Sequence, residues 1–180
     1  ACGIVIHPII DGCVQLRNEH KLKAADIERI ALKVHPLVLE LTGKKTPQVG
    51  LEGKFSVFHS AAVAIIHGEG GEDVYSDACV RDPEVITLRD KVSAEVDKSV
   101  HEDAAHIEIE LNDGRTLTKH VEHAIGSLAR PMSDADLEAK FRKFANGILS
   151  TGETDALIKL CWALDKLKDA GEIARASVPA

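Results

Sequence analysis

Two histidines and two polar residues are the side chains best placed for acid–base chemistry. His59 lies where a polar approach containing Lys54 and Ser56 gives way to an apolar run of small residues. Imidazole titrates near neutral pH, so a histidine that faces a cleft can take up or release a proton. His7 stands directly before Pro8, at the start of a predicted helix, and has a similar position. The alternative for both histidines is a structural, hydrogen-bonded role.

No pair of histidines or cysteines has the local spacing of a metal site. His120 and His123 are three residues apart in a predicted strand and therefore on opposite faces, and His101 and His106 are expected to be solvated. The cysteines show no C-x-x-C and no evident histidine partner, which is typical of reduced thiols: Cys2, Cys13, Cys79 and Cys161. The sequence predicts no zinc, no iron–sulfur cluster, no other cofactor and no nucleophilic cysteine.

Composition narrows the class of protein. The 180 residues carry a formal net charge of −7, which argues against a nucleic-acid surface because such surfaces need clustered Lys and Arg. No apolar run reaches the roughly 18 residues of a membrane span. The first residues lack the charged segment of a signal peptide, so a cytoplasmic protein is expected. The chain opens without methionine inside an apolar run, which predicts a fragment.

The elements that must position the candidate residues follow from hydrophobic periodicity. Small residues predict a buried helix over 55–66 that ends at the glycines after it. Alternating apolar residues predict strands, and Asp113-Gly114 between two such runs is a strong hairpin signal. The predicted strands cover residues 27–35, 92–97, 105–111 and 115–121, and the other predicted helices cover 8–20, a turn at 37–41, a segment from 83, one from 133 and one over 154–170 ending at Gly171.

These elements predict an α+β fold, with a small, mainly antiparallel sheet and packed helices, followed by C-terminal helices. The strand ending at His35 should join the Asp113-Gly114 hairpin in one sheet, with the helix over 55–66 packed on it. The ring of His59 is expected to face an open cleft, within reach of Ser56 or His7.

With these stretches in view, the sequence resembles the MmgE/PrpD family, which includes 2-methylcitrate dehydratases, cis-aconitate decarboxylases and iminodisuccinate epimerases. The resemblance begins in the stretch from Lys54-Phe55-Ser56 to Gly68 and extends, in consistent order, over nearly the whole chain. Three further stretches carry it: Cys2-Gly3 to His7-Pro8, Asp113-Gly114-Arg115, and Pro131-Met132-Ser133 to Phe141. It covers the C-terminal portion of proteins that are more than twice as long.

The resemblance implies two domains. Residues 1–130 correspond to an α+β lid-type domain, and residues 131–180 to C-terminal helices that return to an all-helical domain of the same protein. The active site would lie in the cleft between lid and helical domain. The family's lid-side tyrosine falls on His59, a departure that lowers the pKa of the acid–base group toward neutrality. A family lysine would lie upstream of Ala1, and His7 matches a histidine of that segment.

The implied function is that of a metal-independent lyase of the 2-methylcitrate dehydratase type, which moves a proton at the carbon next to a carboxylate of a small di- or tricarboxylate. His59 and His7 would be the catalytic groups, while Lys54 and Ser56 would contact the substrate carboxylate or orient the helix entrance. Two alternatives stay open: an epimerase or isomerase of the iminodisuccinate type, and a non-catalytic binding or assembly module. A homodimer is the expected assembly, with no nucleic acid and no membrane as partner.

Overall fold

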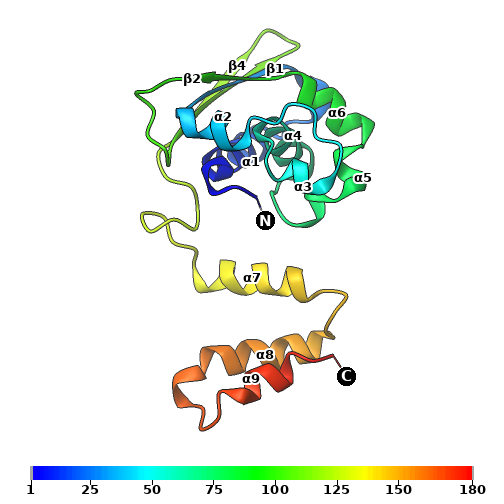
Figure 1. Ribbon diagram of the computed structural model, residues 1–180, viewed down its shortest axis with the longest axis vertical. Coiled ribbons are helices and arrows are strands. Elements are labelled where there is room, and N and C mark those ends of the chain that lie inside the picture. The colour runs from blue at the N-terminus through cyan, green and yellow to red at the C-terminus, as the bar shows by residue number, and fades with distance from the viewer. Residues whose placement is uncertain (1, 180) are drawn as a thin grey trace. The chain divides into compact units, whose positions relative to one another are not determined.

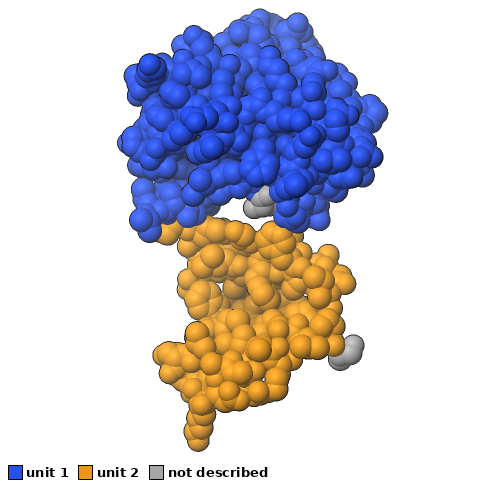
Figure 2. All heavy atoms as spheres, viewed as in Figure 1, with its two compact units in different colours: residues 1–130 blue, residues 131–180 orange. Residues whose placement is uncertain are grey.

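The computed structural model describes residues 2–179 and divides the chain into two compact units, residues 1–130 and 131–180 (Figures 1 and 2). The first unit contains the sheet and all the candidate residues, and the second unit is helical. Among the described residues, every helix is too short or too polar to cross a membrane.

The first unit is built on a four-stranded sheet in the order β2-β1-β3-β4. The strands are β1 (Ile27–Val34), β2 (Val92–Val96), β3 (Ala105–Leu111) and β4 (Thr116–Val121). β1 pairs with β2 in parallel and with β3 antiparallel, and β3 pairs with β4 antiparallel. The turn between β3 and β4 contains Gly114 at φ 85°, a left-handed conformation that glycine adopts without strain. The predicted α+β fold, with a mainly antiparallel sheet, is confirmed.

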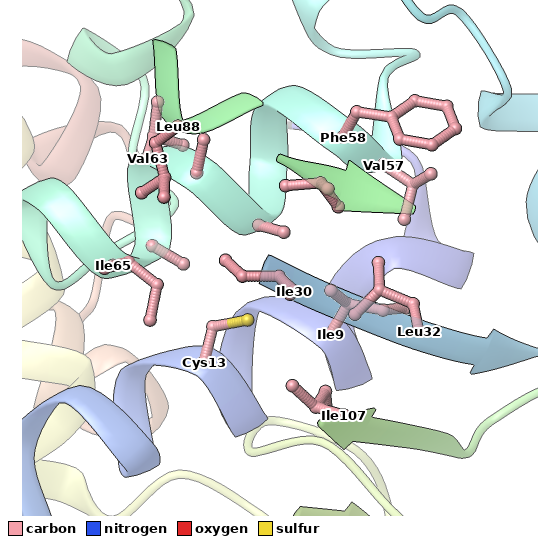
Figure 3. Packing of buried hydrophobic residues seen from close by; sticks show 14 of the residues in the cluster. Ile9, Cys13, Ile30, Leu32, Val57, Phe58, Val63, Ile65, Leu88 and Ile107 are labelled. Atoms are coloured by element: carbon pink, nitrogen blue, oxygen red, sulfur yellow. The ribbon is translucent and has the colours of Figure 1, made fainter. Parts of the chain in front are cut away.

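Two helices, α1 (His7–His20) and α4 (Val57–His67), cover one face of the sheet (Figure 1). Figure 3 shows Ile9 and Cys13 of α1 beside Ile30, Leu32 and Ile107 of the sheet. α1 comes very close to β3, because a Cβ added at Gly12 would lie 2.4 Å from Cδ1 of Ile107. The core of the unit therefore lies between these two helices and the sheet.

Short elements connect the strands and helices of this unit. They are η1 (Ile4–Ile6), η2 (Ala24–Asp26), α2 (Pro36–Thr42), α3 (Gly50–Gly53), η3 (Asp73–Tyr75), α5 (Asp77–Val80) and α6 (Pro83–Asp90). The turn at α2 and the helix after Asp82 were predicted, and the Asp82 side chain caps α6 by accepting from the backbone N–H of Glu84. The helix α3 was not predicted, because the glycines at both of its ends favour a loop.

The second unit consists of α7 (Asp134–Ala145), α8 (Thr151–Trp162), η4 (Leu164–Lys166) and α9 (Gly171–Ala176). The start of α7 at the Ser133–Asp136 capping box was predicted. The prediction of one helix over 154–170 was wrong. A second capping box, formed by Ser150 and Glu153, starts α8 three residues earlier, and the helix already ends at Trp162. Gly171 begins a helix rather than ending one, because the Asp169 carboxylate accepts from its backbone N–H.

Candidate functional site

His59 lies in the first turn of α4, but its ring is not in an open cleft. The Ser56 hydroxyl caps the helix by accepting from the backbone N–H of His59 at 3.1 Å. The side chain of His59 has no exposed surface. The expectation of a cleft-facing ring within reach of Ser56 or His7 is therefore wrong for this structure. The reason is that Gly53 of α3 and Val74 of η3 lie against the ring.

The ring of His59 is held in one tautomer. Its Nε2 lies 2.8 Å from the carbonyl oxygen of Val74, which can only accept, so Nε2 carries the proton and donates it. Nδ1 then bears a lone pair and, within residues 2–179, has no hydrogen-bond partner. Burial lowers the pKa of His59 below 6.5, and the charges of Arg89 and His67 lower it further, against the opposing effect of the Val74 bond. The imidazole is therefore neutral at pH 7.

Gly53 of α3 packs directly against the His59 ring. A Cβ added at Gly53 of α3 would lie 3.3 Å from Cδ2 of His59 and 2.9 Å from Cγ2 of Val80. Only the backbone of α3 fits there, and Gly53 itself is buried. On another side the ring of Tyr75 lies 5.6 Å from the His59 ring, centroid to centroid.

A buried polar cluster of Cys2, His59, Ser60 and Tyr75 extends from this ring toward the surface. The hydroxyls of Ser60 and Tyr75 share a hydrogen bond of 2.9 Å, and the half-buried Cys2 thiol is close enough to influence the Tyr75 hydroxyl. Burial raises the pKa of Tyr75 far above its usual value, and the Cys2 thiol raises it further. Tyr75 therefore stays a neutral hydroxyl. The sequence analysis did not identify it, although it is the only tyrosine in the chain.

Arg89 is a second residue that the sequence analysis missed. Its side chain is buried, its Nη1 donates to the carbonyl oxygen of Val80 at 3.2 Å, and its Nε has no partner. Within the described part of the chain no carboxylate pairs with it. A buried guanidinium stays charged, so it acts on His59 as a fixed positive charge. No sequence signal marks this arginine, because it belongs to an ordinary amphipathic helix.

Of the remaining candidates, His7 and Lys54 lie at or near the surface and Ser56 is buried. His7 begins α1 with an exposed side chain. The Lys54 ammonium pairs with the Glu72 carboxylate at 2.6 Å, and this pairing lowers the pKa of Glu72. The backbone carbonyl of Lys54 also accepts from the N–H of Gly3, which fixes the segment containing Cys2 beside the entrance of α4. Lys54 is thus near the cluster, whereas Ser56 is a buried cap.

One cysteine has a histidine neighbour that sequence spacing did not reveal. The Sγ of Cys79 lies 3.7 Å from Nε2 of His67. Burial raises the pKa of Cys79, and Asp82 raises it further, so this thiol is not activated as a nucleophile. In the described residues no group of three or more His, Cys, Asp or Glu side chains is arranged around a possible metal position.

The lowered pKa of His59 predicts a pH dependence of stability. Unfolded, the ring titrates near 6.5, and between that value and the lower folded pKa the unfolded chain binds more protons. The free energy of unfolding should therefore fall as pH decreases below about 6.5. Urea unfolding at about pH 7.5 and pH 5.5 measures the effect. His59→Gln, whose amide can still donate to Val74, should show a smaller pH dependence. An unchanged dependence in His59→Gln would assign it to other groups, such as His106, whose pKa is also lowered.

Comparison with known proteins gives one family and a consistent set of relatives. The MmgE/PrpD C-terminal domain matches residues 1–164. A cis-aconitate decarboxylase of Mus musculus is 27% identical over 96% of this chain and 37% of its own length. The Homo sapiens cis-aconitate decarboxylase is 28% identical over 91% of this chain and 35% of its own length. The Aspergillus terreus enzyme of the same name is 26% identical over 70% of this chain and 27% of its own length. The chain spans between about a quarter and little more than a third of the length of these curated relatives.

Proposed function

Because the chain belongs to the MmgE/PrpD family, we propose that it is the lid portion of a metal-independent lyase acting on a small di- or tricarboxylate. The observation that carries this proposal is the match over residues 1–164, together with relatives named as cis-aconitate decarboxylases, which are lyases. The reaction would move a proton at the carbon next to a carboxylate. The rest of the site would come from an N-terminal helical domain of the same protein.

His59 is the proposed acid–base group. Its neutral ring donates from Nε2 to Val74, so the partnerless Nδ1 is the nitrogen available to receive a proton. Reaching a substrate requires α3 to move away from the ring, and α3 is only four residues long. The exposed His7 is proposed as an auxiliary acid–base group.

Lys54 and Ser56 have different proposed roles. The Lys54–Glu72 pair lies at the surface, where ion pairs are worth about 0–1 kcal/mol, so a substrate carboxylate can replace Glu72 as the partner of the ammonium. The buried Ser56 oxygen is occupied by the N–H of His59. Its supported role is to orient the entrance of α4 and, through it, the imidazole.

Two lyase reactions share the proposed proton step. Dehydration of the 2-methylcitrate type is the expectation from the sequence, and decarboxylation of cis-aconitate is the activity named for the relatives. Epimerisation of the iminodisuccinate type is favoured by one observation: a neutral histidine, rather than a tyrosine, can both remove and return a proton near pH 7. A cytoplasmic homodimer is part of the proposal.

The test compares the product of the complete reading frame with the 180-residue chain. Each is assayed with cis-aconitate, 2-methylcitrate and iminodisuccinate, following release of carbon dioxide, water loss or inversion. We expect the complete protein to turn over a tricarboxylate and the 180-residue chain to be inactive, because a half-site cannot hold a substrate between its groups. Turnover of iminodisuccinate alone would favour the epimerase. No turnover of any of the three by the complete protein would favour a binding or assembly module.

A further inference from the structure

The sheet face that is turned away from α1 and α4 carries two histidines side by side. His106 of β3 is in register with His120 of β4, and both side chains are exposed. Their neighbours Ile107 and Val121 are buried, as expected from the alternation of side chains along a strand. The thirteen residues between the two histidines include the Asp113-Gly114 turn, so the hairpin, and not local spacing, brings the rings together.

The rings are separated by the distance that one metal ion requires. The two Nδ1 atoms are 3.1 Å apart, and the ring centroids are 4.1 Å apart with an interplanar angle of 32°. An ion bound by imidazole nitrogens at about 2.0–2.1 Å holds two neighbouring ligands about 2.8–3.4 Å apart, for angles between square-planar and tetrahedral geometry. The distance between the Nδ1 atoms falls inside this range. Without an ion, one Nδ1–H donates to the other Nδ1.

Charged groups surround the pair. Burial lowers the pKa of His106, and the neighbouring His120 lowers it further. The Asp97 carboxylate raises the pKa of His106, and its negative charge also favours a bound cation. Lys33 of β1, in register with His106, carries a positive charge that counteracts the effect of Asp97. Because metal-binding histidines must be unprotonated, binding of the ion should weaken as pH decreases.

We propose that His106 and His120 form a surface chelate for one divalent transition-metal ion of the Cu²⁺, Ni²⁺ and Zn²⁺ class, with water in the other positions. Imidazole suits these three ions, and affinity should be highest for Cu²⁺. Since no third His, Cys, Asp or Glu of the described residues completes a group around it, the site is an open one with exchangeable positions. This site is on the sheet face, away from the buried polar cluster, and the inference does not depend on the proposed function.

The test is a Ni²⁺ titration of the untagged 180-residue chain by calorimetry, at pH 7.5 with a non-chelating reductant. Ni²⁺ is chosen because, unlike Cu²⁺, it does not oxidise the thiols. We expect one ion per chain and at least about tenfold weaker binding in His106→Ala and in His120→Ala. The matched control is His101→Ala, an exposed histidine of the same unit that should bind as the parent does.

A second measurement tests whether weaker binding in a variant reflects loss of the site or loss of folding. Bound Ni²⁺ should raise the unfolding temperature of the parent chain, because a ligand that binds only the folded state stabilises it. The increase should vanish in His120→Gln, a polar variant on an exposed strand position that should fold normally. Parent-like affinity in either alanine variant, or no saturable binding by the parent chain, would overturn the proposal.

Discussion

Replacing His59 with alanine in the complete enzyme is expected to lower kcat by roughly 10²–10⁴-fold, the usual contribution of a positioned acid–base group. The result rests on the proposed function. Unlike a residue of an open cleft, the buried ring should also leave a packing defect and an unpaired carbonyl at Val74. We therefore expect a loss of about 1–3 kcal/mol in the free energy of unfolding. Steady-state kinetics and urea unfolding measure the two effects separately.

His59→Gln separates catalysis from folding. The glutamine amide can donate to Val74 but cannot act as a base near pH 7. It should recover most of the stability and little of the turnover. The matched control is His67→Ala, an exposed histidine at the other end of the same helix, which should keep its turnover. Full turnover in a folded His59→Gln enzyme would show that the residue is purely structural.

Ile107→Ala should be the most destabilising of the simple truncations in the sheet, with a loss of about 2–5 kcal/mol. Ile107 is 1% exposed and lies between α1 and the sheet, where Gly12 brings the two very close (Figure 3). Because α1 has no larger side chain at position 12 to fill the space, the cavity should collapse poorly. Chemical denaturation of the 180-residue chain checks the value.

The control for this truncation is Leu128→Ala. Leu128 is a fully exposed residue of the same unit, so the same kind of truncation should change the free energy of unfolding by no more than about 0.5 kcal/mol. Equal losses in the two variants would mean that the contact of α1 with β3 contributes little to stability.

Local signals were sufficient where one segment determines its own structure. The Asp113-Gly114 hairpin, the Ser133 capping box and the small-residue helix α4 were all predicted, since turn chemistry, capping and periodicity act within a few residues. The parallel pairing of β2 with β1 was not predicted, because register between distant strands depends on the whole core. The second capping box at Ser150 was present in the sequence and was overlooked.

The site was less predictable than the fold. His59 was identified from its place between polar and apolar residues, but its burial depends on α3, whose glycines did not suggest a helix. Tyr75 and Arg89 reach the His59 neighbourhood from later segments, and no local motif marks either one. The pairing of His106 with His120 likewise appears only once the register of the hairpin is known.

The position of β1 has a consequence for synthesis of the chain on the ribosome. Both of its neighbours in the sheet come later in the sequence, as the pairs Ile30–Val92 and Ile30–Ile109 show. Until those segments have emerged, β1 has two open edges and an apolar face without a complete core. Such a strand is prone to pair with other chains, and its native pairings require closing long loops. The nascent chain should therefore depend on chaperones until β3 has been made.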